Sequence, residues 1–402
     1  MKRFLISSTI LVTLFFVLAL PLPPSPVQGQ APPTENLTDE CVSEFDETVD
    51  YFPEKVTVSY AEGFTVTYAG HYKTVAVDLP TGESFEYILV QCGTPTPEDT
   101  GDATVIEIPV ADTIALSTSQ LPHLTELGVV DHLVGIDSFL YTNSPEVVDR
   151  IEAGEVIEIG FSSDLNVELV LDAEPDIVFS DGFGDVHSVL ADTGVPVAIN
   201  GEWAEALPLG RAEWIKFTAL LYNEEATATE VFEEIATEYE DLVALTADLP
   251  EDEKPSVLYG TYLSFTEAWN IPGSETYTAQ LFRDAGARMV LEDADEVRGQ
   301  RGSIPFDFEV VYDAGLEADY WIPDAFGVTS LDDLLAQDDT LQPADLYSDF
   351  EAVDAGNIYN TSGRVNASGG NDYYESGVLY ANVELADYIS IFHPELLPDH
   401  DL

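Results

Sequence analysis

The stretch LNVELVLDAEPDIVFSDG, residues 165–182, returns in altered form as PFDFEVVYDAGLEADYWIP, residues 305–323. Each copy places a glutamate in an apolar surround, Glu168 in the first and Glu309 in the second. An aspartate follows four residues later, and a further aspartate opens a short apolar run; these are Asp172 and Asp176, then Asp313 and Asp319. A unit that occurs twice, so far apart, predicts a chain built from two similar halves.

Both halves alternate helical stretches with short apolar runs that Gly or Pro often precede and polar loops often follow. The runs are residues 133–136, 156–159, 176–180 and 196–199 in the first half and 257–260, 319–322 and 357–359 in the second. Strands buried on both faces and alternating with helices are typical of parallel sheets. The predicted fold class is therefore α/β, with two Rossmann-like lobes.

One long helix is predicted between the halves. Residues 224–245 contain no Gly or Pro, and Val231, Ile235, Tyr239 and Leu242 recur at helical spacing. Such a segment spans about 33 Å. A single helix between two lobes leaves a cleft between them, which is the usual place for a small ligand.

The N-terminal part has a different rhythm. Residues 56–90 alternate apolar and polar positions between Gly- and Pro-containing turns, which predicts an antiparallel β meander. Before it, Lys2 and Arg3 precede an apolar run over residues 4–20, which predicts a secretory signal peptide and an exported protein, periplasmic or associated with the cell surface. An uncleaved membrane anchor is the open alternative.

Together these patterns divide the chain into six parts. They are a signal peptide (1–29), a disordered linker (30–55), a β-rich N-terminal extension (56–104), an N-terminal α/β lobe (105–223), a bridging helix and linker (224–254) and a C-terminal α/β lobe (255–402).

Composition excludes several functions. The chain carries 76 acidic and 13 basic residues, a net charge of −63, which repels nucleic acid and anionic lipid. An apolar content of 45% argues against disorder of the whole chain. Cys41 and Cys92 are the two cysteines, and in an exported protein we expect them to form a disulfide worth roughly 4 kcal/mol.

Three phrases add to the repeated unit: PVADTIALSTSQLPHLTELGVVDHLVGID, PLGRAEWIKF and the tail GNDYYESGV…FHPELLP. With the two halves and the bridging helix, they resemble the substrate-binding proteins of ABC importers for ferric siderophores, haem and vitamin B12. The resemblance covers roughly residues 105–402. It implies a monomeric, non-enzymatic protein without a cofactor that captures an iron chelate, a ferric siderophore above all, for a dimeric ABC permease. Haem or a corrinoid is the alternative ligand.

The resemblance also implies a role for the repeated glutamates. In that family each lobe projects one glutamate that engages arginines of one permease subunit, and by position these would be Glu168 and Glu309. The alternative is that each carboxylate only stabilises the first turn of a helix.

Candidate ligand-binding residues follow from the rule that ligands lie beyond the carboxyl ends of parallel strands. The set is Ser119, Gln120, Tyr141, Phe183, Trp203, Tyr262, Trp269, Arg298, Arg301 and Phe326. Its aromatic members suit a bulky ligand, although each is also compatible with the core. Arg298 and Arg301 suit an anionic ligand, or they neutralise nearby carboxylates.

The six histidines form no HExxH or HxxxH pair, so a metal site made of protein ligands is not predicted.

Two other classes of protein stay open from the sequence. A secreted enzyme on a similar two-lobed fold would turn over its chelate or a glycan without a permease. A surface adhesion protein would bind its partner through residues 41–104 alone.

Overall fold

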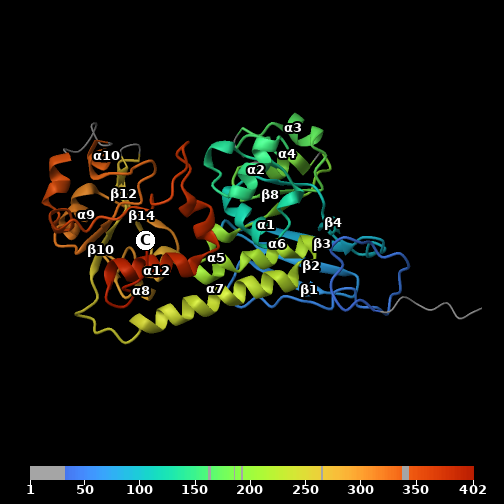
Figure 1. The fold of residues 1–402 in the computed structure, drawn as a ribbon, viewed down its shortest axis with the longest axis horizontal. Coiled ribbons are helices and arrows are strands. Elements are labelled where there is room, and N and C mark those ends of the chain that lie inside the picture. The colour runs from blue at the N-terminus through green and yellow to red at the C-terminus, as the bar shows by residue number, and fades with distance from the viewer. Residues whose placement is uncertain (1–31, 162–163, 185, 192, 264–265, 337–343) are drawn as a thin grey trace, which may run out of the picture. The chain divides into compact units, whose positions relative to one another are not determined.

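The computed structural model describes residues 32–161, 164–184, 186–191, 193–263, 266–336 and 344–402 (Figure 1). The predicted signal peptide lies outside the described residues. Within them, no helix has both the length and the apolar character needed to cross a membrane.

The first lobe is built on a parallel sheet with the strand order β7-β6-β5-β8-β9. Its strands are β5 (Thr113–Ala115), β6 (Leu133–Ile136), β7 (Ile157–Glu158), β8 (Ile177–Ser180) and β9 (Val197–Ile199). Its helices are α1 (Leu121–Glu126), α2 (Pro145–Ala153), α3 (Val167–Asp172) and α4 (Val186–Ala191). Every residue of β5, β8 and β9 is buried, which is why these strands read as continuous apolar runs in the sequence.

The second lobe combines a parallel and an antiparallel sheet. The parallel sheet has the order β13-β10-β15, and a bridge from Trp321 to Ile358 extends it. The antiparallel sheet has the order β11-β12-β14. The strands are β10 (Ser256–Tyr259), β11 (Tyr262–Leu263), β12 (Ala268–Pro272), β13 (Arg288–Met289), β14 (Ser303–Phe306) and β15 (Tyr320–Ile322). The helices are α8 (Tyr277–Asp284), α9 (Phe308–Gly315), α10 (Leu331–Ala336), α11 (Glu351–Ala355) and α12 (Ala381–Phe392).

The α/β class predicted from the sequence is confirmed, but the antiparallel sheet of the second lobe was not predicted. Its strands have two to five residues, and Pro272 and Pro305 interrupt the alternation that identifies a strand.

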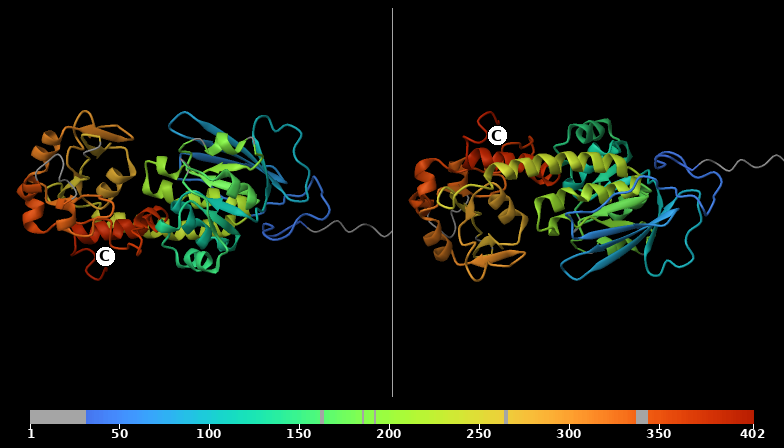
Figure 2. Two further views of the ribbon diagram at one scale, coloured as in Figure 1. Left: turned by 90° about the horizontal axis from the view of Figure 1, so that it is seen from above. Right: turned by 90° about the horizontal axis from the view of Figure 1, so that it is seen from below.

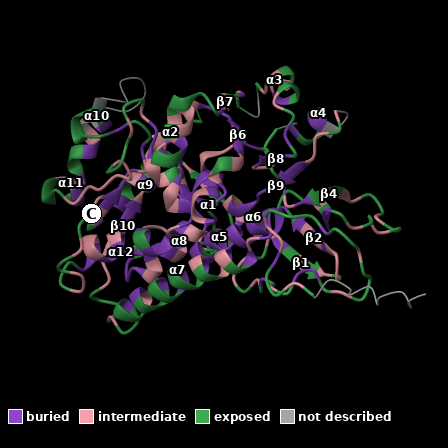
Figure 3. Cartoon of the chain, turned by 45° about the vertical axis from the view of Figure 1, so that its right-hand side comes forward, coloured by how far each residue is buried: buried purple, intermediate pink, exposed green. Residues whose placement is uncertain are grey.

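Helix α7 (Glu225–Thr246) runs beneath both lobes (Figures 1 and 2). It packs against α6 (Trp214–Tyr222), which follows α5 (Pro208–Ala212), and against α12 of the second lobe. Every residue of α6 is buried, whereas α7 alternates buried and exposed positions (Figure 3). The amphipathic spacing read from the sequence therefore corresponds to a helix that rests one face on both lobes.

The N-terminal sheet has the order β1-β2-β3-β4, with β1 (Phe64–Tyr68), β2 (Tyr72–Asp78), β3 (Ser84–Gln91) and β4 (Thr104–Ile108). The first three strands form the predicted antiparallel meander, but β4 pairs with β3 in parallel. The sheet thus extends past the predicted boundary at residue 104.

The apolar–polar alternation at residues 56–60 does not form a strand. The backbone N–H groups of Ser59, Tyr60 and Ala61 donate to the carboxylate of Glu213, at 2.6–2.9 Å for the shortest bond of each. This buried side chain occupies the donors that a neighbouring strand would otherwise use, and so it ties the extension to the first lobe.

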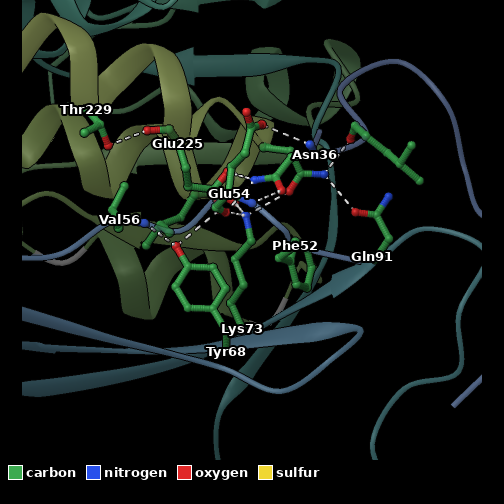
Figure 4. Close-up of polar contacts among 12 residues, drawn as sticks. Asn36, Phe52, Glu54, Val56, Tyr68, Lys73, Gln91, Glu225 and Thr229 are labelled. Atoms are coloured by element: carbon green, nitrogen blue, oxygen red, sulfur yellow. Dashed lines mark hydrogen bonds and ion pairs between the residues drawn. The ribbon is translucent and has the colours of Figure 1, made fainter. Parts of the chain in front are cut away.

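The disordered linker predicted for residues 30–55 is wrong for the part from Pro32 onward. Cys41 and Cys92 are joined by a disulfide, and Phe52 is fully buried. Asn36 is also buried, and its amide donates to Glu54 O and to Glu225 Oε2 of α7 (Figure 4). The polar composition was misleading because these groups bond to residues distant in the sequence.

Candidate ligand-binding site

A cavity of about 490 Å³ opens between the two lobes. It is lined by Leu116, Ser117, Thr118, Asp137, Tyr141, Phe161, Asp181, Phe183, Gly184, Phe326, Asn371 and Tyr374. Most of these residues follow the carboxyl ends of β5, β6, β8 and β15, where parallel α/β sheets bind their ligands. The volume lies within the range of roughly 300–1,000 Å³ that is usual for small-molecule sites.

Aromatic side chains from both lobes form the walls of the cavity. Tyr141 of the first lobe lies 5.9 Å from Phe161 and 6.2 Å from Phe326 of the second lobe, between ring centroids. Phe326 in turn lies 6.5 Å from Tyr374. Phe183 and Phe326 leave 52% and 53% of their surface exposed. Large apolar surfaces left open in a concave site are typical of ligand binding.

Two carboxylates lie among these aromatic rings. Asp137 accepts a 2.7 Å hydrogen bond from Ser138 N, and Asp181 accepts a 2.9 Å bond from Phe183 N. Burial raises the pKa of Asp137 to about 6, and the negative charges of Asp181 and Glu158 add to the effect. Burial also raises the pKa of Asp181. None of the described lining residues is basic, so the cavity is an acidic site.

A segment of the second lobe holds the loop that carries Tyr141. The buried carboxylate of Glu375 accepts bonds from Asn143 N and Ser144 N at 2.7 and 2.8 Å. Asn366 Nδ2 donates to the carbonyl oxygens of residues 140 and 142. At Gly370 an added Cβ would lie 2.7 Å from Tyr141 Cα, so only glycine permits this approach. These contacts hold the loop that carries Tyr141 against the second lobe.

The model of the periplasmic binding protein family matches residues 114–365, more than half of the chain. The chain belongs to this family. The resemblance predicted from the sequence is confirmed by this match.

The chain is also similar to individual proteins and solved structures. An uncharacterized lipoprotein of Methanocaldococcus jannaschii is 24% identical over 303 residues, which cover 72% of this chain and 67% of the relative. A periplasmic binding protein of Veillonella parvula has a TM-score of 0.57 at 14% identity, covering 82% of this chain and 94% of its own. A periplasmic heme-binding protein of Roseiflexus has a TM-score of 0.53 at 20% identity, covering 71% and 98%. At these identities the solved structures share the fold with this chain.

The structure of this periplasmic binding protein brings Tyr141, Phe183 and Phe326 of the predicted set into the cavity wall. Trp203 lies behind the wall: its ring is 4.5 Å from that of Phe183, and its indole N–H donates to Asp181 O. Ser119 and Gln120 are buried beside the cavity and do not line it.

Two predicted aromatic residues belong to the second lobe instead of the cavity. Trp269 is fully buried, and its indole N–H donates to Tyr259 O. Tyr262 packs edge-on against Phe308, with ring centroids 5.6 Å apart. Both belong to the unpredicted antiparallel sheet, Tyr262 in β11 and Trp269 in β12. Trp269 lies in the core, and Tyr262 packs against it.

The two arginines lie on the surface and are paired with carboxylates. Arg298 contacts Asp295 at 3.2 Å, and Arg301 contacts Glu62 at 2.9 Å and Glu275 at 3.5 Å. Neither lines the cavity. Of the two roles open in the sequence, the structure places both arginines where they neutralise local acidity.

Several cavity residues were missed, although the sequence contained a signal for them. Asp137 directly follows the strand predicted over residues 133–136, and Phe161 closely follows the run over 156–159. Asn371 and Tyr374 lie in the tail phrase that carried the family resemblance.

Within the described parts of the chain, no group of three or more His, Cys, Asp or Glu side chains is arranged to hold a metal ion.

Two aspartates of the repeated unit bond to the backbone of a neighbouring segment. Asp176 Oδ2 accepts from Ala111 N ahead of β5, and Asp319 Oδ2 accepts from Ser256 N of β10. Glu168 and Glu309 are each the second residue of a helix, α3 and α9, and both are exposed. Neither glutamate forms an ion pair with any residue that the structure describes.

Proposed function

We propose that this exported protein binds a metal chelate between its lobes and delivers it to an ABC import permease. The observation that carries the proposal is the cavity at the strand ends, where aromatic side chains from both lobes face one another. Such walls suit a bulky complex that is held by stacking and apolar burial. A chelate brings its own metal ligands, so the protein has to supply only shape, aromatic faces and charge.

A ferric siderophore is the proposed class of chelate, and a corrinoid or haem is the alternative. The names of structural relatives support this range: they include a possible iron-binding protein of Staphylococcus epidermidis and heme-binding proteins of Roseiflexus and Vibrio cholerae. The family supports binding in preference to catalysis.

Delivery would use Glu168 and Glu309. Their matched positions at two helix starts, with both carboxylates exposed, suit a permease that offers two basic sockets. Exposed charge pairs of this kind are screened over about 8 Å at physiological ionic strength, so docking should weaken with salt.

Uptake into vesicles that contain the cognate permease tests the proposal. Glu168→Ala and Glu309→Ala should each lower uptake of the iron chelate, and the double variant should lower it further, while chelate affinity is unchanged. Glu174→Ala and Glu317→Ala, which remove exposed charges farther along the same two units, should leave uptake unchanged. Equal losses in the control variants, or a loss of chelate binding in the glutamate variants, would contradict the assigned docking role.

A further inference from the structure

Asp137 and Asp181 lie on either side of the end of β5. Asp137 follows β6 and Asp181 follows β8, and these strands are the two neighbours of β5 in the sheet. Ser117 and Thr118, which follow β5, line the cavity between them. The two carboxylates interact electrostatically, so they present a single negative region to a ligand.

Elsewhere the chain supplies a counter-charge to several of its buried glutamates. Glu225 pairs with Lys73, Glu213 with Lys216 and Glu202 with Arg211. The cavity aspartates accept hydrogen bonds from neighbouring backbone N–H groups but pair with no Lys or Arg that the structure describes. Asp137 is buried and Asp181 is half-buried. A carboxylate removed from water is stabilised by a positive charge, so a ligand could supply the cation that the chain does not.

The aromatic walls also favour a positively charged ligand. The faces of Tyr141, Phe161 and Phe183 carry partial negative charge, which attracts cations within about 6 Å. The net charge of −63 adds a field that repels anions from a cleft of this kind.

We infer that the cavity selects metal complexes by charge: it takes neutral or cationic complexes, with their positive centre against Asp137 and Asp181, and it rejects anionic ones. This inference rests on the proposed function and narrows its ligand class. It disfavours ferric tricatecholates, which are trianions, and haem, which carries two propionate groups. It favours ferric hydroxamates and cationic corrinoids.

A matched series of ferric complexes tests the inference. The probes are a ferric trihydroxamate that bears a protonated amine, the same complex with the amine acetylated, and a ferric tricatecholate trianion. Binding at pH 7.5 is followed by quenching of tryptophan fluorescence, because Trp203 packs directly behind the cavity wall. The cationic complex should bind roughly tenfold more tightly than its acetylated form, as one charge-assisted contact would give. The trianion should bind most weakly.

Variants assign the preference to the aspartates. Asp137→Asn and Asp181→Asn keep an oxygen that accepts the backbone hydrogen bond, and each should reduce the preference for the cationic over the acetylated complex severalfold. Asp149→Asn removes an exposed charge on α2 and should leave the preference unchanged. Aquacobalamin and cyanocobalamin, a cation and a neutral corrinoid, provide a second pair that distinguishes a corrinoid carrier from a siderophore carrier.

The outcomes separate the inference from the proposed function. If complexes bind regardless of charge, or the trianion binds best, charge selection is overturned and chelate binding stands. If the aspartate variants fold normally, by circular dichroism, and keep the full preference, the preference arises elsewhere and the inference is also overturned. If none of the siderophore or corrinoid complexes binds, the proposed function falls together with the inference.

Discussion

Two sites in the chain hold carboxylates in different ways, one with a cation from the chain and one without. Beneath the N-terminal sheet, the carboxylate of Glu225 lies 2.5 Å from Lys73 Nζ, and both side chains are fully buried (Figure 4). Lys73 also donates to Leu220 O and Asn223 Oδ1, and its ammonium lies 4.7 Å from the centre of the Phe52 ring. In the cavity, Asp137 and Asp181 have aromatic neighbours and no such cation among the described residues.

This difference separates a structural site from a binding site. The Lys73–Glu225 pair is complete within the chain, and it joins the extension to the start of α7. Burial raises the pKa of Asp137 to about 6, and no cation among the described residues offsets this effect. Glu225 holds the fold together with a counter-charge from the chain. Asp137 and Asp181 have no such cation among the described residues and line the cavity, where a ligand can reach them.

The largest expected effect comes from breaking the structural pair. Lys73→Met should lower the free energy of unfolding by about 3–5 kcal/mol, because it leaves the carboxylate of Glu225 buried without a cation. Urea denaturation measures the change. Adding Glu225→Gln should recover part of the loss. Lys55→Met removes a half-exposed partner of Asp50 and should cost less than about 1 kcal/mol. Equal losses for Lys73→Met and Lys55→Met would show that burial does not distinguish the two pairs.

Protonation of Asp137 in the cavity should have a smaller effect, in this case on ligand affinity. The charged groups that face Asp137 are Asp181 and Glu158, and Glu202 acts on Asp181. As the pH falls through about 6, Asp137 takes up a proton and loses the charge that attracts a cation. The affinity for the cationic trihydroxamate should therefore fall severalfold between pH 7.5 and 5, as measured by titration, while that for its acetylated form stays nearly constant. Asp137→Asn should flatten the dependence, and an unchanged slope in that variant would assign the titration to another group.

The smallest effect is expected at the two surface arginines. Arg298→Ala combined with Arg301→Ala should leave chelate affinity within twofold of the wild type and cost at most about 1 kcal/mol of stability, because both side chains form exposed ion pairs. Calorimetric titration and thermal unfolding measure the two quantities. A tenfold loss of affinity for any of the complexes would show that these arginines contribute to ligand binding after all.

The sequence predicted the strands and helices that leave a periodic pattern of apolar residues. It failed where the outcome depends on which way a side chain points. Apolar runs located β6, β8 and β9, and helical spacing located α7, because burial on one face or on two leaves a repeating pattern. The strand-end rule led to Phe183 and Phe326 and would also have found Asp137. It could not show that Trp269 faces a core, since β12 belongs to a sheet without a clear alternation. Nor could it show that the carboxylate of Glu213 accepts hydrogen bonds from the backbone of residues 59–61, because these bonds join residues far apart in the chain.

Native mass spectrometry of the protein purified from its own source tests the central claim most directly. We expect one retained ligand for each chain, with the isotope pattern of a metal and a neutral or positive charge for the complex. The Asp137→Asn, Asp181→Asn double variant from the same source should retain less of it. A retained ligand that contains no metal, or a metal complex that the double variant holds equally well, would contradict the account.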